Sequence, residues 1–125
     1  MTSSLAVCEL GLSAYAVIVH QPSTELTSIP GFRIVAVMDA IVDADLKARE
    51  GKDVTRKSIL VEGRPAREVS FQGTNEGRTF DVRARYIAVD KSVYVLMYSG
   101  LAEPGEDLQK FYDSFKLVSE YASNS

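Results

Sequence analysis

The chain has 125 residues, of which 46% are hydrophobic and 25% are charged, and its formal net charge at pH 7 is -3. This length and composition predict one globular domain spanning residues 1–125. The slightly acidic balance argues against a nucleic-acid partner, which would favour a basic surface. No apolar run approaches the roughly 18 residues that a membrane-spanning helix needs.

The cysteine and histidine content limits the chemistry of the chain. Cys8 is the only cysteine, so an internal disulfide and a metal site made of several thiolates are both excluded. The one histidine, His20, cannot build a histidine-rich metal site. We therefore expect no metal and no cofactor. Because no signal peptide precedes Cys8, the chain as given is expected to be cytoplasmic, and it would be exported or lipid-anchored if a longer precursor exists.

The first third of the chain contains one clear strand signal. Residues 1–13 are poorly determined by pattern, with a short apolar stretch before Gly11. Residues 14–22 are rich in β-branched side chains and end at Pro22, which predicts a strand. The polar stretch 23–31 that follows reads as a loop.

Phe32–Met38 is ambiguous between a buried strand and the beginning of a helix. Its β-branched residues follow a Pro-Gly turn signal, so we favour a strand. Asp39 would then cap a helix that continues to the residues before Gly51. If the helix instead begins near Arg33, one strand disappears from the predicted fold.

Four strand signals follow, separated by short turns that contain Gly63, Asn75 with Gly77, and Asp90. They predict a four-strand antiparallel meander. The third signal alternates, so that its odd-numbered charged residues and its even-numbered apolar residues lie on opposite faces. The charged residues are Asp81, Arg83 and Arg85, and the apolar ones are Phe80, Val82, Ala84, Tyr86 and Ala88.

The last helix is predicted from the apolar spacing of Leu108, Phe111, Tyr112 and Phe115. Residues 118–125 are expected to be a frayed tail. The predicted class is therefore α+β, an antiparallel β-sheet flanked by helices.

Three stretches in this order resemble the PsbP-like α/β/α sandwich superfamily, in its bacterial lipoprotein-like branch: "VEGRPAREVSF", "RARYIAVDKSVYVLMYSG" and "FYDSFKL". The resemblance covers about residues 39–117, while the first third matches only in layout. Ala66 stands where the pattern usually has Gly. The matching residues are Gly63, Pro65, Arg67, Glu68, Tyr94, Phe111, Ser114 and Phe115.

The resemblance implies a function in binding rather than in catalysis. Members of the superfamily are binding or accessory proteins, and we know of no catalytic residue set that they share. The bacterial branch is usually exported, whereas this chain shows no export signal.

Two groups of side chains are candidates for binding. Arg83 and Arg85 stand side by side on one strand face, and we place Arg67 on a nearby strand; arginine pairs bind carboxylates and phosphates through bidentate hydrogen bonds. Pairing with neighbouring carboxylates such as Asp81 is the alternative that we favour. Tyr94 and Tyr98 share one face of a strand and could contact a protein partner, although rings packed beneath a helix are again the simpler interpretation.

The residue pattern supports a catalytic site less than it supports a binding site. Nucleophilic catalysis needs a base within reach, and His20 lies at a strand end, where a structural role is the simpler interpretation. Asp39, Asp43 and Asp45 form an acidic cluster on one helix, without a loop to complete a set of metal ligands. We expect a solvated helix face there, and we assign no catalytic residue.

The leading hypothesis is a non-enzymatic binding or accessory module that acts through protein–protein contacts. One alternative is a small-ligand-binding protein or enzyme with a pocket between sheet and helix, including a cone-shaped α+β domain with an interior cavity. Another is a structural homodimer sealed by an edge strand or by the tyrosines.

Overall fold

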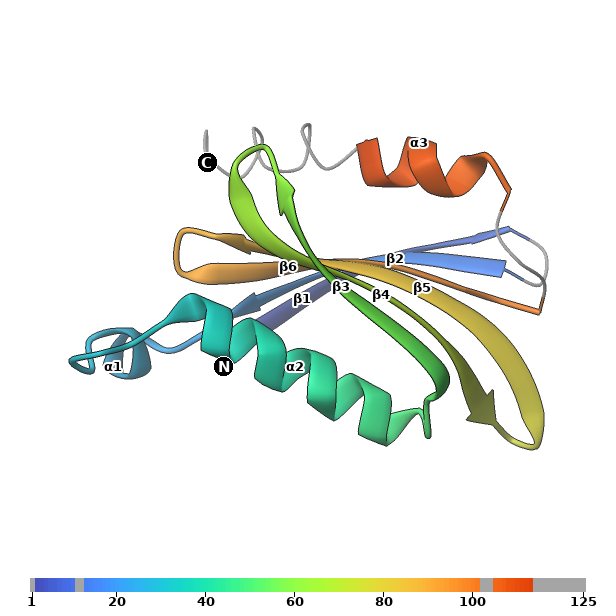
Figure 1. Ribbon diagram of the computed structural model, residues 1–125, viewed down its shortest axis with the longest axis horizontal. Coiled ribbons are helices and arrows are strands. Elements are labelled where there is room, and N and C mark those ends of the chain that lie inside the picture. The colour runs from blue at the N-terminus through green and yellow to red at the C-terminus, as the bar shows by residue number, and fades with distance from the viewer. Residues whose placement is uncertain (1, 11–12, 102–104, 114–125) are drawn as a thin grey trace.

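The computed structural model describes residues 2–10, 13–101 and 105–113. Within these residues the chain forms one six-stranded antiparallel sheet and three helices, with α2 and α3 on opposite faces of the sheet (Figure 1). The predicted α+β class with helices flanking an antiparallel sheet is confirmed. In chain order the elements are β1 (Thr2–Leu10), β2 (Ser13–Gln21), α1 (Thr24–Thr27), α2 (Ile34–Ala48), β3 (Lys52–Val61), β4 (Arg64–Asn75), β5 (Arg78–Val89), β6 (Ser92–Gly100) and α3 (Asp107–Asp113).

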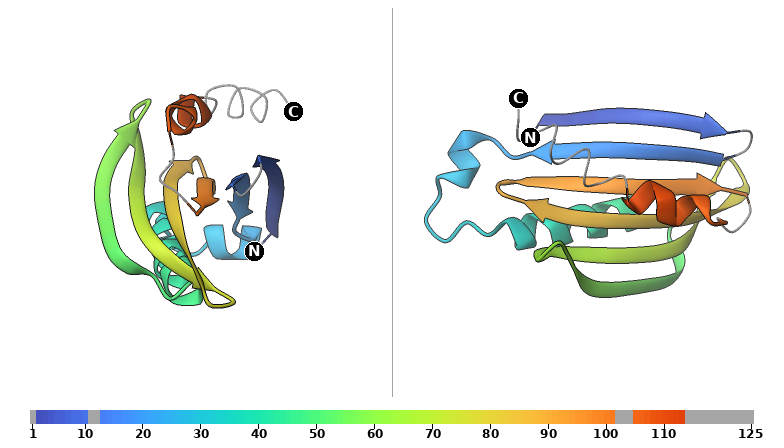
Figure 2. Two further views of the ribbon diagram at one scale, coloured as in Figure 1. Left: turned by 90° about the vertical axis from the view of Figure 1, so that its right-hand side faces the viewer. Right: turned by 90° about the horizontal axis from the view of Figure 1, so that it is seen from above.

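The strand order is β1-β2-β6-β5-β4-β3. The β1–β2 hairpin therefore joins the meander beside β6, and the segment with α1 and α2 carries the chain to the opposite edge of the sheet. Seen from above, α3 lies over the middle strands and leaves the β3 edge uncovered (Figure 2). The candidate functional site lies where this cover ends, between α3 and the β3 edge.

Two-residue turns fix the register of the meander. Glu62 and Gly63 have φ angles of 51° and 77°, and Glu76 and Gly77 repeat these values. Positive φ at both central residues is the pattern of type I′ turns, whose twist matches that of the flanking strands. The predicted meander is confirmed as β3 to β6, and β2 confirms the predicted strand at residues 14–22.

The preferred strand at Phe32–Met38 is wrong, because α2 begins at Ile34. Met38 and Val42 are fully buried one helical turn apart, so packing on the sheet outweighs the β preference of the branched residues. Arg33 occupies the N-cap position in an extended conformation, with no side-chain hydrogen bond to the helix. Asp39 is therefore an interior residue of α2 rather than its cap.

Helices α2 and α3 each cover an apolar cluster, on opposite faces of the sheet. The first cluster joins α2 to alternate residues of β4, β5 and β6, and it includes Met38, Ile41, Val42, Val69, Phe71, Val82, Ala84, Tyr86, Ala88, Val93, Val95 and Met97. The second lies beneath α3, and it includes Ala66, Ile87, Tyr94, Leu96 and Tyr112. The predicted alternation along β5 is thus confirmed.

The predicted last helix is confirmed over Asp107–Asp113. Ser114 and Phe115 of the resemblance, together with the tail 118–125, lie outside the described residues. Among the described residues, no helix combines the length and the apolar character needed to cross a bilayer.

Met38→Ala should lower the free energy of unfolding by about 2–5 kcal/mol, because it opens a cavity between α2 and the sheet. Urea denaturation followed by circular dichroism measures this change. Ile29→Ala, at an exposed position in the loop before α2, is the control, with an expected change within about 0.5 kcal/mol. Equal effects of the two substitutions would contradict the observed packing of α2.

Candidate functional site

The α3 face of the sheet carries two polar rows across β3, β4 and β5, next to the apolar residues Ala66 and Ile87. Antiparallel pairing brings side chains of the same face into rows that cross the strands. One row consists of Lys57, Glu68 and Arg85, and the next of Thr55, Ser70 and Arg83. Across β6 and β2 the same rows continue with apolar and aromatic residues, namely Leu96 and Val17 in the first row and Tyr98 and Tyr15 in the second. The sheet thus offers α3 an apolar cluster to pack on and two polar rows beside it.

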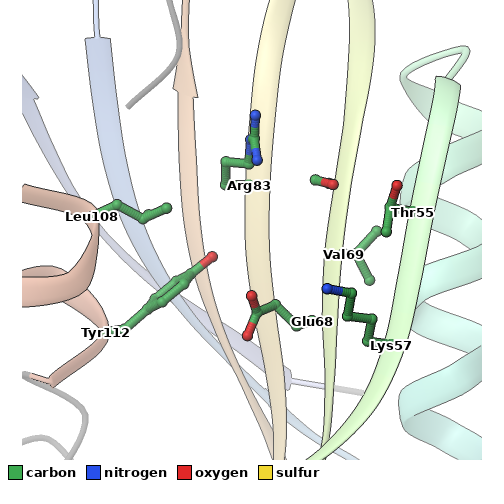
Figure 3. Close-up of a pocket in the computed structure, with 8 residues that line it drawn as sticks. Thr55, Lys57, Glu68, Val69, Arg83, Leu108 and Tyr112 are labelled. Atoms are coloured by element: carbon green, nitrogen blue, oxygen red, sulfur yellow. The ribbon is translucent and has the colours of Figure 1, made fainter. Parts of the chain in front are cut away.

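A hollow of about 120 Å³ lies between α3 and the polar half of the sheet (Figure 3). The short side chains of Thr55 and Ser70 leave space between the longer side chains of the neighbouring row and the helix. Its lining residues are Thr55, Lys57, Glu68, Val69, Ser70, Arg83, Leu108 and Tyr112. Three strands and one helix therefore contribute to the site.

Both carboxylates near the hollow are engaged by arginines. Glu68 accepts a hydrogen bond from Arg85 at 3.0 Å, and Asp81 accepts two from Arg83, at 3.0 and 3.2 Å. These groups are partly exposed, so each pair contributes only about 0–1 kcal/mol to stability. Their main effect is to hold the two guanidinium groups in place.

Arg85 also joins the sheet to α3. Its guanidinium carbon lies 4.3 Å from the centroid of the Tyr112 ring, a cation–π contact. Tyr112 is only 5% exposed, and burial raises the pKa of its hydroxyl, so the group stays protonated at neutral pH. The Nε of Arg85 is buried and has no hydrogen-bond partner among the described residues.

Two polar groups of the hollow have no partner within the described part of the chain. Lys57 stands opposite Glu68 in the register, yet its ammonium makes no ion pair there. The Tyr112 hydroxyl makes no hydrogen bond to any described residue. Figure 3 shows the ends of both side chains extending toward the space between α3 and β3. These are the groups of the site that a ligand can engage.

The structure separates the three arginines that the sequence suggested as ligand-binding residues. Arg83 and Arg85 lie side by side on the α3 face, as expected. Arg67 lies on the opposite face, where its Nε donates to Asp39 of α2 at 3.0 Å. A single site made of all three arginines is therefore excluded, because alternate residues of β4 point to opposite faces.

The aspartates of α2 pair with residues of the sheet, while the side chains of Asp39 and Asp43 stay 37% and 69% exposed. Asp39 accepts hydrogen bonds from Arg56 and Arg67, and Asp43 accepts one from Arg56 at 2.7 Å. Asp45 accepts a hydrogen bond of 2.8 Å from the hydroxyl of the fully buried Tyr86. Among the described residues, no group of three or more His, Cys, Asp or Glu side chains could hold a metal ion.

His20 lies on the α2 face at the end of β2, on the other side of the sheet from the hollow. Burial lowers the pKa of its imidazole, while the charge of Asp45 acts in the opposite direction. The only histidine of the chain is thus separated by the sheet from the groups that line the hollow.

Tyr94 and Tyr98, suggested as partner-binding residues, are 6% and 3% exposed. The ring of Tyr98 lies 5.2 Å from that of Tyr15, which in turn lies 5.0 Å from the ring of Phe111 in α3. These rings support the helix. A partner surface formed by the two tyrosines stays a prediction, and little of either side chain reaches solvent.

No protein-family model and no curated protein matches the chain. Among solved structures, the chain is similar to PA94 from Pseudomonas aeruginosa, a protein of unknown function with a suggested role as a regulator. The TM-score is 0.57 at 13% sequence identity, and the alignment covers 95% of this chain and 81% of that one. At this identity the similarity shows a shared fold and nothing about function.

Lys57, Ser70 and the Tyr112 hydroxyl were not identified from the sequence. A signal for the first two was present, because two-residue turns at Gly63 and Gly77 determine which residues face each other across β3, β4 and β5. No comparable signal placed Tyr112, since the position of α3 on the sheet depends on packing.

The buried Tyr86 should make stability fall at high pH. Burial and Asp45 raise the pKa of its hydroxyl above the ordinary value of 10.0. Its contribution is therefore complete below about pH 10 and is lost as the pH rises further, because only the unfolded state then releases the proton. Urea denaturation between about pH 8 and pH 11 should show a smaller decline for Tyr86→Phe, which also loses about 1.5–3 kcal/mol at neutral pH with its hydrogen bond. An identical decline in both proteins would contradict this role of Tyr86.

Proposed function

We propose that the protein is a non-enzymatic binding or accessory module, and that protein partners bind at the α3 face and the adjoining edge strand β3. The observation that carries this proposal is the open edge of β3 beside the polar hollow. Leu60 is 73% exposed at the end of this strand, on the face opposite to the hollow, and Val54 is also exposed. An edge strand offers unpaired backbone groups to an extended segment of another polypeptide, and exposed apolar side chains strengthen such a contact.

The chemistry of the hollow supports binding over catalysis. Its carboxylate, Glu68, is held by Arg85, and the hydroxyls of Thr55 and Ser70 have no histidine beside them. A hydroxyl nucleophile needs an adjacent base, and His20 lies on the opposite face. The groups of the hollow are instead donors and charges, which suit recognition.

Membership of the PsbP-like superfamily forms part of this proposal. The motif residues Gly63 and Pro65 lie at the hairpin between β3 and β4, next to the exposed edge. If the resemblance holds, the protein shares the general character of that superfamily, whose members bind or assist other proteins.

The geometry also bears on the two alternatives, a small-ligand-binding protein or enzyme and a homodimer. A small-molecule pocket typically encloses about 300–1,000 Å³, and the hollow of about 120 Å³ is well below that range. This difference counts against this hollow being the pocket of a ligand carrier or of an enzyme, or the interior cavity of a cone-shaped domain. A homodimer is favoured by the same edge strand as the leading proposal, so a second copy of the chain is one partner that the test must include.

A photo-crosslinking amino acid at position 60 should capture a discrete product, either another protein or a second copy of the chain. The same amino acid at position 29, which is exposed in a loop before α2, is the matched control and should capture nothing specific. Mass spectrometry of the crosslinked product identifies the partner.

Light scattering over a range of concentrations separates the two kinds of partner, since a homodimer is present without any other protein. A chain that stays monomeric at every concentration and gives no specific product from position 60 would contradict the proposed function.

A further inference from the structure

We propose that the hollow beneath α3 binds the carboxylate of an acidic side chain from a partner polypeptide, with the Lys57 ammonium and the Tyr112 hydroxyl as its principal donors. This inference rests on the proposed function and names the chemical group that the binding face recognises. The proposed site contains Lys57, Ser70 and Tyr112 beside Arg83, one of the arginines that the sequence suggested.

Lys57 provides the charge for such a site. It projects from the edge strand toward the hollow (Figure 3), and no described residue pairs with its ammonium. The nearest acidic residue in its row, Glu68, is directed instead to Arg85 at 3.0 Å. A bound carboxylate can therefore reach Lys57 without displacing an existing ion pair.

Tyr112 provides a hydrogen-bond donor at the helix side of the hollow. The residue is 95% buried, since its exposed fraction is 5%, and its hydroxyl is directed into the hollow. Burial keeps this hydroxyl protonated, and the hydroxyl has no acceptor among the described residues. The hydroxyl is therefore available to donate a hydrogen bond to a carboxylate bound in the hollow.

The charge balance favours a carboxylate over a dianion such as phosphate. Among the described residues of the two polar rows and their ion-pair partners, Lys57, Arg83 and Arg85 carry three positive charges, and Glu68 and Asp81 carry two negative ones, which leaves one positive charge. Two of the arginines are already paired, so the uncompensated charge belongs to Lys57. A group with a single negative charge neutralises it.

The size and position of the hollow favour an acidic side chain of a polypeptide. A volume of about 120 Å³ is well below the roughly 300–1,000 Å³ of pockets that enclose whole small molecules, and it suits a small group such as a carboxyl. Lys57 and Thr55 both lie on the edge strand β3. A segment that lies along this edge can therefore place a side chain into the hollow.

The test is an NMR titration of the 15N-labelled full chain with the peptide acetyl-Gly-Ser-Glu-Ser-Gly-amide, alongside the same peptide with Gln in place of Glu. We expect saturable shifts at the backbone amides of Thr55, Lys57, Ser70 and Tyr112 with the Glu peptide only. Lys57→Gln should weaken binding about tenfold or more, as expected for the loss of a charge-assisted hydrogen bond, and Tyr112→Phe about two- to tenfold.

Lys91→Gln is the matched control, because it removes the same charge from the turn between β5 and β6. It should leave the titration unchanged. Equal shifts with the Glu and Gln peptides, or equal losses in Lys57→Gln and Lys91→Gln, would overturn the carboxylate site. The 15N spectrum of each variant shows directly that it is folded.

Sodium acetate at matched ionic strength separates the two sources of a carboxylate. Tighter binding of the Glu peptide than of acetate supports a polypeptide ligand, and tighter binding of acetate overturns it in favour of a free small carboxylate. If position 60 captures a partner equally well in the Lys57→Gln background, the carboxylate site falls and the proposed function stands. If the Glu peptide binds and no partner or dimer is captured, the proposed function falls and the site stands.

Discussion

Burial of α2 against alternate residues of β4, β5 and β6 is the interaction on which the rest of the structure depends. Met38 and Val42 of the helix are fully buried in this layer, together with Tyr86 and Val95 of the sheet. Because strand side chains alternate between faces, the choice of one face for α2 also decides which residues meet α3. A shift of one residue would exchange the two sets and would bury charged side chains beneath α2.

The candidate site follows from this constraint and from the position of α3 on the sheet. The residues of β4 and β5 on the α3 face include Glu68, Arg83 and Arg85, so this face carries polar rows beside the apolar cluster of Ala66 and Ile87. The helix packs on the apolar cluster and borders the polar rows through Leu108 and Tyr112, whose ring lies against Arg85. The hollow is the space that remains at this boundary. Lys57 on the edge strand and Tyr112 of α3 both line this hollow. A partner bound along β3 can therefore also place a carboxylate in it.

Most of the fold could be predicted from the sequence, and the exceptions have physical causes. Turn residues and alternation predict the meander and the two faces of β5, because both signals are local. Phe32–Met38 was assigned to a strand because β-branched residues dominate it, whereas burial against the sheet decides for the helix. Arg67 was grouped with Arg83 and Arg85 by residue type, and only the register of β4 shows that it faces α2. The hollow depends on where α3 lies, which no local pattern encodes.

The central claim is that the sheet divides the side chains of β5 between α2 and α3. Nuclear Overhauser effects in a side-chain-resolved NMR spectrum test it most directly. The account predicts effects between the Tyr112 ring and the Arg85 side chain, and between the Tyr86 ring and protons of α2 near Asp45. Effects that join Arg85 to α2 or Tyr86 to α3 would show that the faces are exchanged, and both the site and its proposed function would then be wrong.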